Sequence, residues 1–266
     1  MPRLPVTPAA EINCLIDGFT DPWTKPETVL LVHGLAESSA VWWAWMPHLV
    51  RRWRVARIDQ RGFGGSTAMP EDFVWSLDLL ADDIGQVVRQ VAPEGVHLVG
   101  AKIAGPVVVR AARRHPKLIR SLSLIGVPVT GPKEPDWLTL VERDGVRAWA
   151  AATMDARLAG MSRAMKDWWI ELMAATPRST MLGFLRFVSS IDVRDDLPLL
   201  RCPVLVVTSD SPRRPVSTVA EWQKRIPESG LVTVAGDGYH AAATEPDACA
   251  RAVAEFIAAA SGRRLG

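Results

Sequence analysis

Residues 96–105 read V-H-L-V-G-A-K-I-A-G, and the fold of the chain follows from this stretch. Residues 96–99 form a mostly apolar, β-branched run of the kind found in buried strands. The two small residues that follow allow a very tight turn, and the spacing from Ile103 onward predicts a helix to about His115. The stretch therefore predicts a strand, a sharp turn and a helix, with Lys102 at the turn.

This turn has the pattern that presents the nucleophile in enzymes with a G-x-S-x-G motif. Small residues two positions before and after that nucleophile allow a strained backbone and close packing of the strand against the helix. Here Gly100 and Ala104 hold those positions, and Lys102 stands where serine would be. Because a strained turn normally exists to present a side chain, we interpret Lys102 as functional. The alternative is a structural cation, paired with Asp210 or Glu37 in a protein without catalysis.

Apolar runs alternate with helical patterns along most of the chain. Runs typical of strands cover residues 11–16, 28–32, 53–58, 122–126, 203–208 and 231–234. Helical spacing covers residues 76–91, 216–226 and 246–260, and another helix is expected to begin near Val41. This alternation predicts an α/β fold, with a mostly parallel sheet flanked by helices and a site at the carboxyl ends of the strands.

Residues 129–197 differ from their surroundings because they show helical periodicity, many Trp and Met residues, and no convincing strand. We interpret them as a helical lid inserted in an α/β core formed by residues 1–128 and 198–266. A lid must cover an apolar cavity, so some of its aromatic residues should line a pocket. The side chains expected at this substrate pocket are His33, Trp42, Trp43, Trp137, Trp168 and Trp169.

The composition argues against several classes of partner and location. The chain has 266 residues, 48% of them hydrophobic, which is enough for one large core. With 31 basic and 29 acidic residues spread along it, the chain offers no electrostatic case for binding nucleic acid or an anionic membrane. Its 3 cysteines lie far apart and suggest neither disulfides nor a zinc site. The N-terminal residues lack the apolar core of a signal peptide, and we expect a cytoplasmic protein.

Three further loops at predicted strand ends carry motifs. His33-Gly34 follows the strand at 28–32, residues 59–66 read D-Q-R-G-F-G-G-S, and residues 236–240 read G-D-G-Y-H. Together with the turn at Lys102, these motifs occur in the order and at the spacing of the α/β-hydrolase fold family. The chain resembles that family over nearly its whole length. It is most similar to the small capped group that contains enol-lactonases, lactonases and carbon–carbon bond hydrolases.

The resemblance implies roles for several residues. His240 corresponds to the catalytic histidine, and the backbone N–H groups of Leu35 and Ile103 to the oxyanion hole. The family usually places an aspartate a few residues beyond the strand at 203–208, and Asp210 is the only carboxylate in that loop. We therefore expect Asp210 to orient His240. Other candidate carboxylates are Glu37 and Asp237, and no metal or organic cofactor is implied.

A lysine at this turn changes the chemistry that we expect. Its nitrogen would lie deeper in the pocket than a serine oxygen, and acyl transfer to it would leave a stable amide. Burial under a Trp-rich lid and the positive end of the following helix would lower the pKa of Lys102. A neutral amine can form a Schiff base with a ketone or aldehyde, which would support carbon–carbon bond cleavage.

We therefore expect a hydrolase-like enzyme acting on a small apolar carbonyl, ester or lactone compound. Lys102 would act as an amine or as an electrostatic group, with His240 as the general acid/base. One alternative is a catalytically inactive homologue that binds a ligand, and another is a protein that uses its lid surface for partners, including a homodimer. A lowered pKa of Lys102 would favour the enzyme, whereas a buried ion pair would favour the binding protein.

Overall fold

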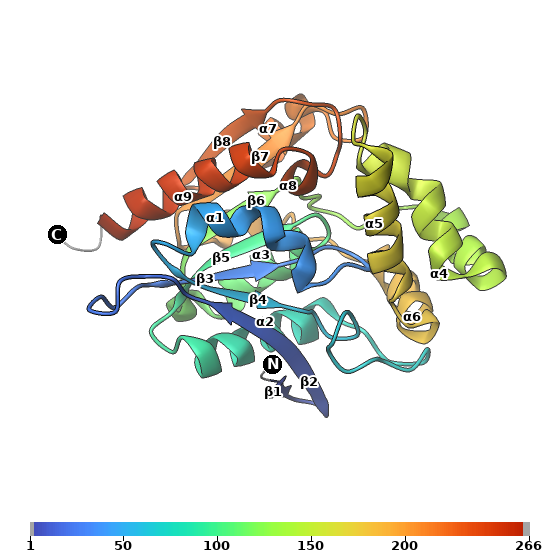
Figure 1. Cartoon of the computed structure of the whole chain (residues 1–266), viewed down its shortest axis with the longest axis horizontal. Coiled ribbons are helices and arrows are strands. Elements are labelled where there is room, and N and C mark those ends of the chain that lie inside the picture. The colour runs from blue at the N-terminus through green and yellow to red at the C-terminus, as the bar shows by residue number, and fades with distance from the viewer. Residues whose placement is uncertain (1–2, 263–266) are drawn as a thin grey trace.

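The strands of this chain pair into one sheet in the order β1-β2-β4-β3-β5-β6-β7-β8 (Figure 1). The computed structural model describes residues 3–262. Strands β1 and β2 pair antiparallel, as do β2 and β4, and the remaining pairs are parallel. The strands span Arg3–Val6 (β1), Ala10–Asp17 (β2), Thr28–Val32 (β3), Arg54–Ile58 (β4), Val96–Ala101 (β5), Ile119–Ile125 (β6), Val204–Ser209 (β7) and Ser229–Val234 (β8).

The central strands are buried along their whole length. Every residue of β3, β5 and β7 is buried, as expected for parallel strands covered by helices on both faces. These strands are continuous β-branched or apolar runs, which explains why the sequence predicts them within two residues. The short edge strand β1 is not predicted, because it has only 4 residues and two of them are exposed.

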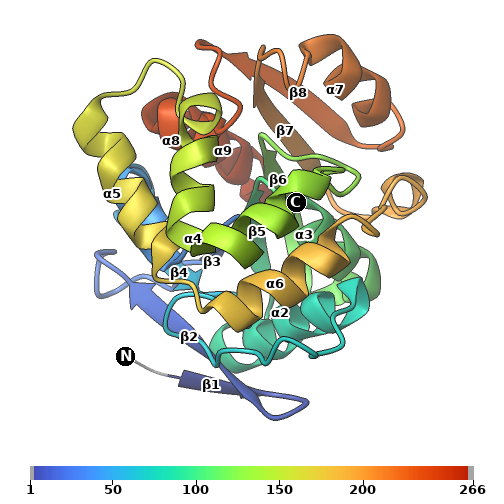
Figure 2. The ribbon, with the colours of Figure 1, turned by 90° about the vertical axis from the view of Figure 1, so that its right-hand side faces the viewer.

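Helices cover both faces of the sheet. Helices α2 and α3 pack against each other, and α1 packs against α9 on the opposite face (Figures 1 and 2). The helices that lie outside the segment between β6 and β7 span Met46–Leu49 (α1), Leu77–Val91 (α2), Ala104–Arg114 (α3), Val216–Gln223 (α7), Ala241–Thr244 (α8) and Pro246–Gly262 (α9). Short 3-10 helices span Ser39–Trp45 (η1), Pro116–Leu118 (η2) and Leu197–Leu199 (η3).

The helix expected near Val41 is the 3-10 helix η1. It begins earlier than expected because Ser38 precedes it in extended conformation, and the Ser38 side chain accepts a hydrogen bond from the Ala40 N–H. The four-residue helix α8, directly after His240, is not predicted from the sequence. Within residues 3–262, no helix combines the length and apolar character needed to cross a membrane. The cytoplasmic location stays a prediction.

Three helices connect β6 to β7 and lie together beside the sheet (Figure 2). They span Pro135–Arg157 (α4), Arg163–Ala174 (α5) and Arg178–Val188 (α6). Helix α4 is broken at Gly145, which has a φ of 84° and a ψ of 175°. These are the helices expected of the lid, although its boundaries at 129 and 197 stay a prediction. The break divides α4 into two halves. Trp137 in the first half and Arg157 in the second line the cavity that contains Lys102.

Strand β5 and helix α3 approach each other so closely that Gly100 has no room for a side chain. A Cβ atom on Gly100 would lie 2.5 Å from Val108 Cγ2, well inside van der Waals contact. The φ of Gly100 is one that other residues adopt, so the constraint is packing and not backbone strain. The turn at Lys102 depends on this close contact, because it fixes where the helix begins relative to the strand.

Gly100→Ala should therefore lower the free energy of unfolding by about 1–3 kcal/mol through overpacking. Urea denaturation measures the loss, and Val108→Ala in the same chain should restore part of it by removing the two methyl groups. Gly18→Ala is the control, because a Cβ there meets nothing within 4 Å. Equal stability of the Gly100 and Gly18 variants would show that the strand and helix are not tightly packed.

Candidate active site

Lys102 lies at the sharp turn between β5 and α3, here called the elbow. Its φ of 56° is in the left-handed region, which is strained for a residue other than glycine. The Lys102 N–H donates to the Ile125 carbonyl at 3.1 Å, and the Lys102 carbonyl accepts from the Gly105 N–H at 2.9 Å. These contacts with β6 and α3 hold the elbow, so the Lys102 side chain is presented at the carboxyl end of the central strand.

The Lys102 amine is buried without a hydrogen-bond or ion-pair partner in residues 3–262. The residue is 6% exposed, and its Nζ lies 3.2 Å from the centre of the Tyr239 ring. Burial lowers the pKa of Lys102 well below its ordinary value of 10.5, the charges of Arg214 and Arg157 lower it further, and Glu37 opposes them.

The Tyr239 ring acts in the other direction, because an aromatic face attracts an ammonium. A desolvated cation–π contact is worth about 2 kcal/mol. Burial and the charges of Arg214 and Arg157 act against this attraction. The net direction favours the neutral amine of Lys102 more than water does.

Glu37 and His240 form a buried pair behind the elbow. The His240 Nε2 lies 2.9 Å from Glu37 Oε1, and Glu37 Oε2 accepts a hydrogen bond from the Gly34 N–H at 2.8 Å. Burial alone would raise the pKa of Glu37, but the charge and hydrogen bond of His240 lower it to about 2. Burial lowers the pKa of His240 against the opposing charge of Glu37.

The protonation of this pair follows from its contacts. An ionised carboxylate only accepts hydrogen bonds, so His240 Nε2 carries the hydrogen and Nδ1 has the free lone pair. The Nδ1 atom is buried, and no hydrogen-bond partner for it is found within the described part of the chain. His240 is also packed by Trp169, whose ring centre is 4.9 Å from the imidazole.

The loop that carries Glu37 packs directly against Lys102. A Cβ atom on Gly34 would lie 2.9 Å from Glu37 Oε1 and 3.0 Å from Lys102 Cβ. Glycine at this position therefore allows the carboxylate to lie beside the elbow. Leu35, from the same loop, lies on the wall of the cavity that contains Lys102.

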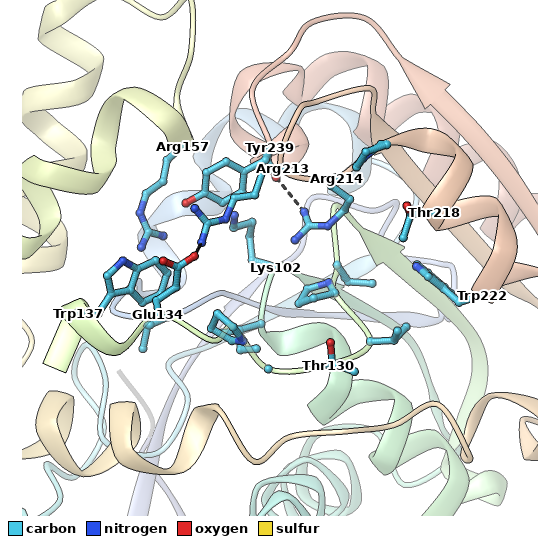
Figure 3. Close-up of a pocket in the computed structure, with 18 residues that line it drawn as sticks. Lys102, Thr130, Glu134, Trp137, Arg157, Arg213, Arg214, Thr218, Trp222 and Tyr239 are labelled. Atoms are coloured by element: carbon cyan, nitrogen blue, oxygen red, sulfur yellow. Dashed lines mark hydrogen bonds and ion pairs between the residues drawn. The ribbon is translucent and has the colours of Figure 1, made fainter.

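The Lys102 cavity has a volume of about 470 Å³ and lies between α4 and the carboxyl ends of the strands (Figure 3). Its walls come from the elbow, the loop after β6, helix α4, the loop after β7 and Tyr239. Four cationic side chains line it, and Glu134 is the only carboxylate among the lining residues, where it pairs with Arg213. The cationic side chains are Lys102, Arg157, Arg213 and Arg214. Within residues 3–262, no three His, Cys, Asp or Glu side chains are grouped to hold a metal ion.

Residues 27–246 match the protein family described as alpha/beta hydrolase fold. The chain belongs to the alpha/beta hydrolase fold family. This confirms the predicted fold class, whereas the correspondence of Lys102 to the nucleophile of the G-x-S-x-G motif stays a prediction.

Named relatives of this family are hydrolase-like enzymes. A putative carbamate hydrolase RutD from Caulobacter sp. (strain K31) is 27% identical over 252 residues, which are 89% of this chain and 92% of the relative. A pimeloyl-[acyl-carrier protein] methyl ester esterase from Aeromonas hydrophila is 28% identical over 68% of this chain and 75% of the esterase. The enol-lactonase from Burkholderia xenovorans LB400 has a TM-score of 0.88 and 18% identity, covering 97% of this chain and 100% of the lactonase.

Asp210 lies apart from the histidine of this alpha/beta hydrolase chain. It is exposed, and its Oδ1 accepts a hydrogen bond from the Val216 N–H at 3.0 Å, at the start of α7. The loop after β7 turns back on itself through backbone hydrogen bonds between Ser211 and Arg214, which directs Asp210 toward α7. The expectation that Asp210 orients His240 is therefore not met by this geometry, and Glu37 contacts the imidazole instead.

The predicted site residues divide between two places. The cavity contains Lys102, Leu35, Ile103 and Trp137, so the oxyanion-hole role of Leu35 and Ile103 stays a prediction. Trp43, Trp168 and Trp169 line a separate surface hollow between η1 and α5, and Trp169 also contacts the His240 ring. Trp42 is buried against Trp45, and the two His33 ring nitrogens bond to the Gly34 carbonyl and the Gln60 N–H.

Sequence reasoning missed most of the charged groups in the cavity. Arg213 and Arg214 lie in the same loop as Asp210, after β7. Two adjacent arginines at the end of a strand are the sequence signal that could have indicated their place in the cavity. Tyr239 directly precedes His240 in the sequence, so its position beside the site could also have been predicted. Arg157 gives no such signal, because only the packing of α4 over the sheet brings it to the cavity.

Replacement of Lys102 should change how stability depends on pH. With the pKa of Lys102 lowered in the folded protein, the unfolded chain binds more protons below pH 10.5, and stability rises with pH in that window. Lys102→Met removes this dependence. The variant should be more stable than the wild type at pH 7, and the difference should shrink by up to about 1.4 kcal/mol per pH unit toward pH 10.5.

Urea denaturation at pH 7, 8, 9 and 10 measures the difference. Lys133→Met is the control, because Lys133 is exposed. A constant difference between wild type and Lys102→Met would mean that the folded protein leaves the pKa of Lys102 unchanged.

Proposed function

We propose that this alpha/beta hydrolase chain is an enzyme in which the Lys102 amine reacts with the carbonyl group of a small ketone or aldehyde. The observation that carries the proposal is the buried Lys102 Nζ on a cavity wall, without a carboxylate partner and beside arginine charges. Desolvation and neighbouring cations are the two means by which proteins make a lysine nucleophilic near neutral pH. An ion pair that would keep the amine charged is absent within residues 3–262.

The proposed reaction uses the protonated Schiff base of the Lys102 amine as an electron sink. The neutral Nζ attacks the carbonyl carbon, the oxygen leaves as water, and a protonated Schiff base forms. Its positive nitrogen accepts the electron pair released when a neighbouring carbon–carbon or carbon–hydrogen bond breaks. The resulting enamine takes up a proton at carbon, which regenerates the protonated Schiff base. Water then hydrolyses this Schiff base, which returns the free amine and releases the carbonyl product. Retro-aldol cleavage, decarboxylation and proton transfer are all reactions of this class.

Glu37 and His240 adjust the charge around the amine in this proposal. The Glu37 carboxylate raises the pKa of Lys102, while its own hydrogen bonds go to His240 and Gly34. Because those bonds occupy Glu37, it does not pair directly with the amine. His240 Nδ1 is the free basic atom of the centre. A role for His240 as general acid/base stays a prediction.

A second candidate function is a ligand-binding protein without catalysis. The observation in its favour is the position of Glu37 on His240 Nε2, since that nitrogen would have to face a nucleophile in ordinary serine chemistry. The fold family and the cavity suit this function equally well. The reactivity of the Lys102 amine separates the two candidates.

Borohydride reduction should trap the substrate on Lys102. The purified chain is mixed with a panel of aromatic and alicyclic ketones, aldehydes and β-keto acids, reduced, and analysed by intact and peptide mass spectrometry. We expect one reduced adduct on Lys102, lost in Lys102→Met and retained in Lys133→Met. The reason is that only an amine neutral near pH 7 forms the Schiff base rapidly.

Other outcomes favour other functions. Turnover of esters or lactones without an adduct would contradict the amine mechanism and make Lys102 an electrostatic group. Neither an adduct nor turnover, in a chain that still binds ligands in the cavity, would favour the binding protein.

A further inference from the structure

The Lys102 cavity has more positive charge than its own carboxylates neutralise. Of its four cationic side chains, only Arg213 forms an ion pair, and its partner is Glu134. Arg157 and Arg214 have no carboxylate partner within residues 3–262. Buried charges are normally paired, because the desolvation penalty of a lone charge is large. Two such arginines beside a cavity favour an anionic group as its occupant.

Arg157 shows this most clearly. It is the last residue of α4 and is 3% exposed. Its Nε donates to Thr153 Oγ1 at 3.0 Å, and its guanidinium carbon lies 4.7 Å from the centre of the Trp149 ring. The Nη2 atom is buried and has no hydrogen-bond partner in the described chain. The aromatic ring and Thr153 fix the guanidinium beside the cavity, and its Nη2 donor stays unpaired within the described residues.

Arg214 reaches the same cavity from the loop after β7. Its Nη1 donates to the carbonyls of Gly126 and Tyr239, which anchors the guanidinium to two segments at the strand ends. Burial lowers the pKa of Arg214 to about 10, which still leaves it charged at neutral pH. In Figure 3 the side chains of Arg157, from α4, and of Arg213 and Arg214, from the loop after β7, extend toward the space around Lys102.

The remaining wall of the cavity is largely apolar. Trp137 and Trp222 line this wall, together with Val127, Pro128 and Val129 of the loop after β6. A guanidinium recognises carboxylate and phosphate oxygens through paired N–H donors. An occupant that satisfies both walls therefore has an anionic oxygen group on an apolar body.

We propose that the cavity selects a small organic anion, whose carboxylate or phosphate group is held by Arg157 and Arg214 and whose apolar part contacts Trp137 and Trp222. This adds an anionic group to the small apolar carbonyl, ester or lactone compound that the sequence suggested. It deepens the proposed function, because it rests on that function for the reacting carbonyl, whereas the binding of the anion does not require the reaction.

Calorimetric titration of the full chain with matched ligands tests the binding. The probes are 3-phenylpropionate, its uncharged amide, 2-phenylethyl phosphate and inorganic phosphate, none of which has a ketone or aldehyde. We expect the acid or the phosphate ester to bind at least tenfold more tightly than the amide. Because a hydrogen bond to a charged group is strong, Arg157→Gln and Arg214→Gln should each weaken anion binding by about tenfold or more.

The control is Arg163→Gln, which removes the same charge from the exposed surface of α5 and should leave all affinities unchanged. The amide should bind the Arg157 and Arg214 variants as it binds the wild type. Equal affinity for acid and amide, binding of inorganic phosphate only, or equal effects of the Arg157 and Arg163 variants would each overturn the proposal. The relative affinity of acid and phosphate ester identifies the anionic group.

Trapping with a matched pair of ketones separates this proposal from the proposed function. The probes are 3-benzoylpropionate and its amide, reduced with borohydride under the same conditions. A faster adduct with the acid supports both proposals. Equal rates would keep the amine mechanism and overturn the anion site. Tight binding of the acid without an adduct would keep the anion site and contradict the amine mechanism.

Arg157→Met provides a second readout, because a purely structural arginine would behave in the opposite way. Removal of an unpaired buried charge should stabilise the empty protein, raising its Tm by about 2–4 °C. Added 3-phenylpropionate should raise the Tm of the wild type and have little effect on the variant. A variant that is less stable than the wild type and still stabilised by the ligand would show that Arg157 supports the fold and not the anion.

Discussion

A lysine amine buried without a counter-charge is the constraint on which the rest of this site depends. The left-handed backbone at Lys102 and the missing side chain at Gly100 bring the amine to the end of the central strand. Once there, it meets arginine charges and the face of Tyr239. Burial and the arginine charges lower the pKa of the amine, and the aromatic ring opposes them. The sharp turn between β5 and α3 therefore holds an amine whose pKa is determined by its surroundings.

The nearest carboxylate does not cancel this effect, because it is already engaged. Glu37 accepts hydrogen bonds from His240 and Gly34, and its charge reaches Lys102 only through space. The same pairing reverses the usual contacts of a catalytic histidine, since the acid lies on Nε2 and Nδ1 is left without a partner. One carboxylate thus determines both the tautomer of His240 and the absence of an ion pair at Lys102.

The sequence predicts the sheet well because its strands are local features. Buried β-branched runs such as β3 and β7 need no knowledge of their neighbours to be recognised. The elbow and the histidine loop are also local, so Lys102 and His240 are found from the chain alone. Short elements with weak patterns, such as β1, are not.

Side-chain partners depend on tertiary packing, and the sequence predicts them less well. Asp210 has the expected spacing, yet the hydrogen bonds of its own loop direct it to the start of α7. The tryptophans of α4 and α5 have helical spacing in the sequence. Which of these two helices faces the cavity depends on how they pack in the fold. The packing of α4 also brings Arg157 to the site, and no neighbouring sequence motif indicates this position.

The Glu37–His240 pair also has a consequence for the ancestry of this chain. Serine at position 102 would be insufficient to recreate a serine hydrolase, because the nitrogen that must accept the serine proton is held by Glu37. A change between the two kinds of centre therefore requires substitutions at both positions 37 and 102, because serine at 102 alone would still face an imidazole whose Nε2 is bound to Glu37.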